Sequence, residues 1–158
     1  MVKYISPPLP QITMLIGQYL SKLTDKNRLA VPKKIRDEVG DKFIVAKWYE
    51  RCLVLVSVDE WQDLVNRLVG PGKIIISPVR DIDRFIMASA FEINLDSQGR
   101  FVLPEDLKRY AEVTSEVIFI GLGDRVEIWA QDSWRKLEEN SEEKASLAIE
   151  KIAKVTVR

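Results

Sequence analysis

The stretch "LDSQGRFVLP", residues 95–104, has the pattern of a tight turn between two strands, and it ends at a proline. An earlier stretch, "LTDKNRLAVP" at residues 23–32, carries leucine, arginine and proline in the same register. Arg28 of the earlier stretch therefore corresponds to Arg100 of the later one. The repeated turn, with an arginine fixed directly after it, predicts that the chain consists of two related halves.

The turn residues support this alignment. Gly99 can adopt a positive φ without steric cost, and Asn27, at the corresponding position, is the next-best residue for that conformation. Thr24 and Asp96 open the two turns, each four residues before the arginine. We therefore expect these four residues to have a structural role in the turns.

The flanks of the two turns also agree. Each turn leads into a short strand, a proline suited to the first turn of a helix, that helix, a hairpin and a second helix. Asp59 and Asp132 stand at the start of the second helices and are expected to be N-caps. An apolar stripe in the first of these helices is expected to face the core; it consists of Trp61, Leu64, Val65 and Leu68.

A unit of about fifty residues buries too little surface to be stable alone. Two such units that interlock their hairpins around a pseudo-twofold axis would share one core. We therefore predict an α+β fold, in which two tandem repeats form a pseudo-twofold, swapped-hairpin β-barrel with flanking helices.

The limits of the pattern set the expected organisation of the chain. Residues 1–13, which contain "SPPLP", are expected to be a disordered extension ahead of a first repeat at 14–69. A connector at 70–87 separates it from a second repeat at 88–138. Residues 139–158 are expected to form a charged, helical C-terminal tail whose glutamates and lysines face solvent.

Composition excludes several classes of function. Hydrophobic residues make up 46% of the 158 positions and charged residues 30%, as in soluble globular proteins. Histidine is absent, which excludes Ser-His, Cys-His and His-metal chemistry. The single cysteine, Cys52, is expected to be a small buried side chain. Since no phosphate-binding glycine loop or metal-ligand spacing occurs, we expect no catalytic residues, no cofactor and no metal site.

The charges are unevenly distributed, although the formal net charge is zero. Residues 22–36 contain six basic side chains and one acid, Asp25. The corresponding residues 94–108 contain two basic and three acidic side chains. A local basic patch in the first half can therefore attract a polyanion that the whole chain would not.

The two turns, the Arg-x-x-x-Pro that each contains, and "DRVEIWAQDSW" at residues 124–134 strongly resemble the MraZ family of bacterial regulators. This family belongs to the AbrB-like (SpoVT-AbrB) swapped-hairpin class of DNA-binding proteins. The resemblance covers roughly residues 14–138, and its hallmark is an Asp-x-x-x-Arg turn present twice. The second turn matches in full, whereas the first departs at Thr24 and Asn27.

The resemblance implies a sequence-specific DNA-binding transcriptional regulator that acts on short direct repeats at the promoter of the division and cell-wall gene cluster. It also implies a closed homo-oligomeric ring, an octamer or a similar assembly, with double-stranded DNA as the partner. Such a regulator is expected in the cytoplasm, associated with the nucleoid and without a membrane partner. A ring repeats a modest basic patch many times, so that linked weak contacts add up to useful affinity.

Candidate DNA contacts follow from the chemistry of the turns. An arginine fork binds a phosphate, or the O6/N7 edge of guanine, with two hydrogen bonds. We assign DNA contacts to Lys26, Arg28, Lys33, Lys34, Arg36 and Arg100. For Arg100 the alternative is an ion pair with Asp96 that braces the turn, whereas Thr24 offers Arg28 no such acid.

Other interpretations stay open at this point. Trp48 and Tyr49 at a hairpin tip can stack on a base or, as we favour, pack on a neighbouring subunit. The segment after Leu137 leaves room for an antitoxin-like regulator of the same fold class, whose tail binds a protein toxin. An enzyme is the third class, and the missing histidine and glycine loop speak against it.

Overall fold

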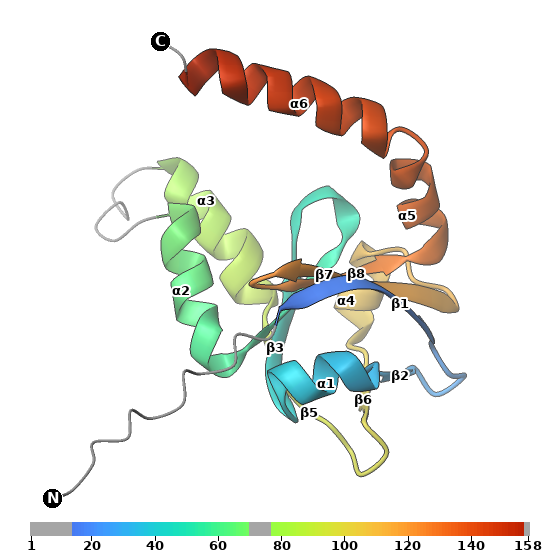
Figure 1. Cartoon of the computed structure of the whole chain (residues 1–158). Coiled ribbons are helices and arrows are strands. Elements are labelled where there is room, and N and C mark those ends of the chain that lie inside the picture. The colour runs from blue at the N-terminus through green and yellow to red at the C-terminus, as the bar shows by residue number, and fades with distance from the viewer. Residues whose placement is uncertain (1–13, 70–76, 157–158) are drawn as a thin grey trace, which may run out of the picture.

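The computed structural model describes residues 14–69 and 77–156 (Figure 1). The expected extension at 1–13 lies outside the described residues, as do residues 70–76 of the connector and the last two residues of the tail. Helices combine with antiparallel strands throughout the described part, which confirms the α+β class.

Both halves have the same order of strand, strand, helix, strand, strand and helix. In the first half these elements are β1 (Leu15–Lys22), β2 (Arg28–Ala30), α1 (Lys33–Val39), β3 (Lys42–Lys47), β4 (Leu53–Ser57) and α2 (Val58–Val69). In the second half they are β5 (Phe91–Asn94), β6 (Arg100–Val102), α4 (Glu105–Tyr110), β7 (Glu116–Gly123), β8 (Val126–Ala130) and α5 (Gln131–Glu138). The remaining elements are η1 (Tyr49–Arg51), α3 (Ser77–Ile86), η2 (Met87–Ser89) and α6 (Ser141–Thr156).

The strand pairing joins the two halves. Six strands form an antiparallel sheet in the order β1-β7-β8-β4-β3-β5, so the first strand of each half pairs with the hairpin of the other. The order is unchanged when each strand is exchanged for its counterpart in the other half. Strands β2 and β6 form a separate two-stranded sheet, which we call the β2–β6 ribbon.

The six-stranded sheet is open at β1 and β5, because each of these strands has one neighbour in it. Among the residues that the structure describes, no strand pairing closes the sheet into a barrel. The closed barrel expected from the sequence therefore stays a prediction.

A first hydrophobic core lies between the six-stranded sheet and the β2–β6 ribbon with α1 and α4. Leu29 and Phe101 are paired in the ribbon and are both buried. The Phe101 ring meets the ring of Phe43 on β3 edge-on, with centroids 5.6 Å apart. Ile35 of α1 and Leu107 of α4 are fully buried in the same core. This packing fixes the ribbon, and with it the two turns that precede its strands.

A second core lies on the opposite face of the sheet, under α2, α3 and α5. Trp61, Leu64 and Val65 are buried there, as expected from the apolar stripe of α2. Cys52 is buried in the same cluster. Burial, and secondarily the carboxylates of Glu127 and Glu50, raise the pKa of its thiol.

The helix caps differ from the prediction. Helix α2 begins at Val58, so that Asp59 lies inside its first turn, and the Oγ of Ser57 accepts a hydrogen bond from the Glu60 N–H at 3.3 Å. Helix α5 begins at Gln131 after Ala130, without a side-chain cap. The N-cap assignments of Asp59 and Asp132 were therefore wrong, because each helix begins two residues earlier than an N-cap at the acid requires and includes the acid in its first turn.

Candidate nucleic-acid interface

The second turn is held by the carboxylate of Asp96. Its Oδ1 accepts hydrogen bonds from the N–H groups of Gln98 and Arg100, each at 2.9 Å, and its Oδ2 pairs with Arg100 Nε at 3.2 Å. The backbone bond from Arg100 is the main reason why the pKa of Asp96 is lowered. Gly99 has φ +74° and donates its N–H to the Asp96 carbonyl at 3.0 Å. The ion pair considered as the alternative role of Arg100 is thus present.

The first turn has the same backbone but fewer side-chain bonds. The Thr24 Oγ1 accepts one hydrogen bond, from the Arg28 N–H at 3.1 Å. Asn27 has φ +58° and donates its N–H to the Thr24 carbonyl at 3.0 Å. Within residues 14–69 and 77–156 the guanidinium of Arg28 has no acidic partner, so its charge is not neutralised by a neighbour.

The β2–β6 ribbon brings both arginines to one surface. Arg28 pairs with Val102, and Arg100 pairs with Ala30, in an antiparallel register. Side chains of paired residues lie on the same face, and the intervening Leu29–Phe101 pair faces the core. Arg28 and Arg100 therefore lie diagonally across the outer face of the ribbon.

Each turn is also contacted by a cation from the other half. The Arg36 guanidinium of α1 lies against Gly99, so that a Cβ at Gly99 would come within 2.5 Å of Arg36 Nη1. In the reverse direction, Lys108 Nζ of α4 donates a hydrogen bond to Asn27 Oδ1 at 2.9 Å. Arg36 and Lys108 both follow a helix-starting proline by four residues, a signal that could have identified Lys108 from the sequence.

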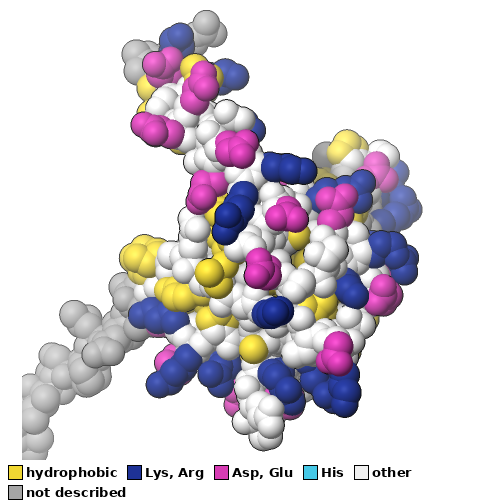
Figure 2. Space-filling model, turned by 90° about the vertical axis from the view of Figure 1, so that its right-hand side faces the viewer, with side chains coloured by type: hydrophobic (Ala, Val, Ile, Leu, Met, Phe, Trp, Pro, Cys, Tyr) yellow, Lys and Arg dark blue, Asp and Glu magenta, His cyan; other side chains and the backbone are white. Residues whose placement is uncertain are grey.

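Together these residues make a basic surface around the ribbon, which we call the ribbon face. Lys33 and Lys34 are exposed at the start of α1, and Lys26 is exposed in the turn between β1 and β2. All six predicted DNA-contact residues thus lie on or beside the ribbon; the three lysines are exposed, and the three arginines, Arg28, Arg36 and Arg100, are half-buried. Figure 2 shows Lys and Arg side chains gathered along the lower edge of the molecule, where α1 and β2 lie in Figure 1.

Residues 22–36 and 94–108, which surround the ribbon, contain four acids, of which two are paired. Asp96 pairs with Arg100, and Asp106 Oδ2 pairs with Lys47 Nζ at 3.0 Å. Asp25 and Glu105 are exposed next to the ribbon face. The balance therefore stays positive around the first turn and is closer to neutral around the second.

The hairpin tip differs from expectation. Trp48 is buried, stacks against Tyr49 with centroids 4.9 Å apart, and accepts a hydrogen bond from the Tyr110 hydroxyl on its carbonyl. Because the Trp48 side chain is only 4% exposed, with the Arg125 guanidinium 6.0 Å from its ring, the indole is not available to stack on a base or to pack on a neighbouring subunit. Tyr49 remains partly exposed.

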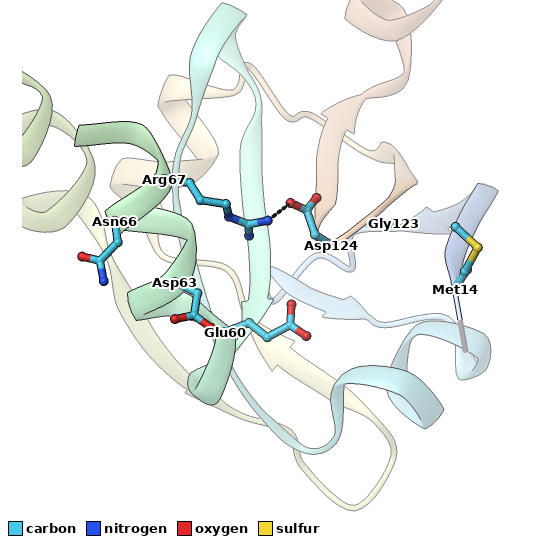
Figure 3. A pocket seen from close by; sticks show the side chains of 7 residues that line it. All are labelled: Met14, Glu60, Asp63, Asn66, Arg67, Gly123 and Asp124. Carbon is cyan, nitrogen blue, oxygen red and sulfur yellow. Dashed lines mark ion pairs between the residues drawn. The ribbon is translucent and has the colours of Figure 1, made fainter. Parts of the chain in front are cut away.

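A wide hollow lies elsewhere, between α2 and the tip of the β7–β8 hairpin (Figure 3). It has a volume of about 760 Å³ and is lined by the acids Glu60, Asp63 and Asp124. Arg67 pairs with Asp124 at 2.8 Å across it. These acids would repel a phosphate. In the described ranges no group of three or more His, Cys, Asp or Glu side chains is arranged to hold a metal ion, and none of the helices has the length and apolar character needed to cross a bilayer.

Comparisons with known proteins agree on one family. A family model described as "MraZ protein, putative antitoxin-like" matches residues 86–155. A protein of Syntrophomonas wolfei named transcriptional regulator MraZ is 40% identical over 129 residues, which cover 82% of this chain and 90% of that protein. A protein of the same name from Caldicellulosiruptor saccharolyticus is 39% identical over 140 residues, or 89% of this chain and 94% of that protein.

Proposed function

Because the chain belongs to the MraZ family of transcriptional regulators, we propose that it is a sequence-specific DNA-binding regulator and that the ribbon face is its contact with double-stranded DNA. The observation that carries this proposal is the diagonal placement of Arg28 and Arg100 on the outer face of one two-stranded ribbon. The relatives in the comparisons are named transcriptional regulators, and a binding role on DNA fits that name.

The geometry of the ribbon suits the major groove. A two-stranded antiparallel ribbon fits into that groove, and arginines on its outer face can reach the O6 and N7 atoms of guanine. Arg100 is held in place by Asp96, whereas Arg28 has its full charge available. Lys33 and Lys34, beside the ribbon on α1, are placed to follow the phosphate backbone.

The assembly and the target belong to the same proposal. We propose a homo-oligomeric ring that binds direct repeats at the promoter of the division and cell-wall gene cluster, in the cytoplasm and associated with the nucleoid. We also propose that the two halves form the pseudo-twofold, swapped-hairpin barrel. The exchange symmetry of the strand order supports this, as does the 2.6 Å hydrogen bond from Ser21 Oγ on β1 to the Ala30 carbonyl on β2.

The test is an electrophoretic mobility shift with DNA from upstream of the protein's own gene and a scrambled duplex of equal composition. We expect the native duplex to bind at least about tenfold more tightly, and log affinity to fall linearly with log salt concentration. Equal affinity for both duplexes would contradict sequence-specific binding.

A second candidate function is an antitoxin-like regulator that binds a protein toxin through its C-terminal tail. Two observations favour it: the description of the matching family, and the exposure of α6 along residues 141–155. The test is to co-express the chain with a small toxic protein. If the toxic protein co-purifies with the chain through two columns, the result supports the antitoxin-like function.

A further inference from the structure

The outer face of strand β1 exposes apolar side chains. Ile16 is 58% exposed and Leu20 is 70% exposed. Their partners on β7 are Leu122 and Ile118, respectively. Because Ile118 belongs to the second core, these side chains lie on the face of the sheet that α2, α3 and α5 cover elsewhere. We call Ile16, Leu20 and Leu122 the β1 strip; Figure 2 shows hydrophobic side chains on the left, between the α6 arm above and the basic lower edge.

The first half covers the equivalent surface. There α3 packs over β3, with Ile86 buried and Ile82 against the same core. In the alignment of the two halves, the β5 residue that corresponds to Leu20 is Glu92, which is exposed. Thus the β3–β5 end of the sheet has α3 over it and a polar edge strand, whereas the β7–β1 end has an apolar edge strand that α5 reaches through the 3.0 Å hydrogen bond from Gln18 to Glu138.

Helix α6 is the counterpart of α3, since each follows the last helix of its half. Figure 1 shows that α6 projects away from the sheet. All of residues 141–155 are exposed, and Ala145, Ala148, Ile149 and Val155 share one face of the helix. Ile149 is 67% exposed and Val155 is 76% exposed, so this apolar face is not buried within its own chain.

The joint between α5 and α6 directs α6 away from its own β1 strip. Glu139 has helical dihedrals, φ −52° and ψ −32°. Its N–H bonds to the Arg135 carbonyl at 3.1 Å, and the Lys144 N–H bonds to the Asn140 carbonyl at 3.0 Å. A two-residue turn, residues 139–140, thus joins the helices, and Figure 1 shows that α6 leaves it in a direction that keeps it clear of its own sheet.

We propose that α6 of one copy lies along the β1 strip of a second copy, in the place that α3 occupies in the first half. The inference rests on the homo-oligomer that is part of the proposed function, and it assigns the contact surfaces. The lengths match: eight residues of β1 span about 26 Å at about 3.3 Å each, and sixteen residues of α6 span about 24 Å at 1.5 Å each.

The charge at one end of the strip complements that of α6. Beyond Ile16 the β1 strip is bordered by the hollow of Figure 3, which has three acids, Glu60, Asp63 and Asp124, and one arginine, Arg67. Beyond Leu20 the charges balance, because Lys22 and Arg135 lie with Glu116 and Glu138. At its start helix α6 carries Glu142, Glu143 and Lys144, a net charge of −1. Near its end it carries Glu150, Lys151 and Lys154, a net charge of +1. The basic end of α6 then lies at the acidic end of the strip.

A groove next to Leu20 fits the same occupant. It has a volume of about 330 Å³ and is lined by Leu20, Ile118 and Trp134, among others. The apolar part of this lining extends the β1 strip toward α5. Because the two contacting surfaces differ, the contact repeats from copy to copy and closes a ring if the rotation between copies permits.

The first test measures mass by light scattering for the full chain, for Ile149→Glu, and for Leu147→Glu as control. Leu147 is 52% exposed and lies about 200° around the helix from Ile149, so both variants place the same charge on exposed positions of α6. We expect the full chain and the control to be oligomers and Ile149→Glu to shift at least about tenfold toward smaller species. Equal masses for all three would overturn the proposal.

The second test uses disulfide cross-linking of two co-expressed chains, one with Leu20→Cys and one with Ile149→Cys; Cys52 is buried and does not compete. A cross-link between the two chains, absent when Leu147→Cys replaces Ile149→Cys, supports the proposal. A cross-linked monomer formed by a chain with both substitutions would overturn it in favour of α6 folding back. An oligomer that forms without any cross-link between Leu20→Cys and Ile149→Cys would also overturn the proposed α6–β1 contact. That result would not affect the proposed DNA binding, which the mobility shift tests separately.

Discussion

In the second turn three donors converge on the carboxylate of Asp96, whereas in the first turn the Thr24 hydroxyl accepts a single backbone N–H. Both turns nevertheless have the same backbone path, and both deliver an arginine to the same face of the β2–β6 ribbon. The backbone conformation of the turn therefore does not depend on whether its arginine is paired with an acid. In the second turn Asp96 holds the turn and pairs with Arg100, whereas in the first turn Arg28 has no acidic partner among the described residues.

The comparison predicts that the two halves behave alike where they share the core. Leu29→Ala and Phe101→Ala each remove a buried, mutually paired side chain of the ribbon. We expect losses in the free energy of unfolding of about 2–5 kcal/mol for Leu29→Ala and about 3–5 kcal/mol for Phe101→Ala. Urea denaturation measures both. A loss below about 1 kcal/mol for either variant would show that its half does not share the core as described.

The halves should differ at the positive-φ position. Gly99→Ala forces a Cβ into the left-handed region and displaces the Arg36 guanidinium, which we expect to cost about 1–2 kcal/mol of unfolding free energy. Asn27→Gly relieves the strain at φ +58° while it removes the acceptor of Lys108, so its net effect should stay within about 1 kcal/mol. Urea denaturation midpoints of the two variants measure these changes in stability. Equal losses of unfolding free energy for Gly99→Ala and Asn27→Gly would mean that contacts between the halves matter more than backbone strain.

The smallest predicted difference is in pH dependence. The pKa of Asp96 is lowered in the folded protein, so its carboxylate contributes stability above the ordinary aspartate pKa near 4, and that contribution is lost as pH falls through the lower folded pKa. The gap in melting temperature between the wild type and Asp96→Ala should therefore be widest near pH 7 and narrow below about pH 4. The gap for Thr24→Ala should not change with pH. A constant gap for Asp96→Ala would show that its charge is not what holds the turn.

The sequence predicts local features of this molecule well, because they depend on single residues. The turns, the conformations of Gly99 and Asn27, the buried face of α2 and the helical tail were all expected and are present. These features follow from backbone preferences and periodicity, which neighbouring residues determine.

Contacts between the halves were not predictable in the same way. The packing of Arg36 on Gly99, the bond from Lys108 to Asn27 and the bond from the Tyr110 hydroxyl to the Trp48 carbonyl each join residues more than sixty positions apart. They depend on the register of strands from different halves, which local patterns do not contain. For the same reason the sequence assigned DNA contacts to both Arg28 and Arg100, with an ion pair to Asp96 as the alternative for Arg100, without showing that the two arginines share a face.

The central claim is that the unpaired arginine of the first turn dominates DNA binding, while the braced arginine of the second turn mainly supports the fold. The most direct measurement is fluorescence anisotropy on the upstream duplex, from 50 to about 200 mM salt, combined with melting temperatures. The variants are Arg28→Ala, Arg100→Ala and, as control, Arg84→Ala, whose side chain is 74% exposed on α3.

For Arg28→Ala we expect a loss of about 1–3 kcal/mol in binding, a salt slope lower by about one unit per engaged contact, and an unchanged melting temperature. For Arg100→Ala we expect a smaller binding loss and a lower melting temperature, and for Arg84→Ala no change in either. If Arg100→Ala abolishes binding in a fully folded protein while Arg28→Ala binds like the wild type, the claim is contradicted and the intact second turn is the DNA contact.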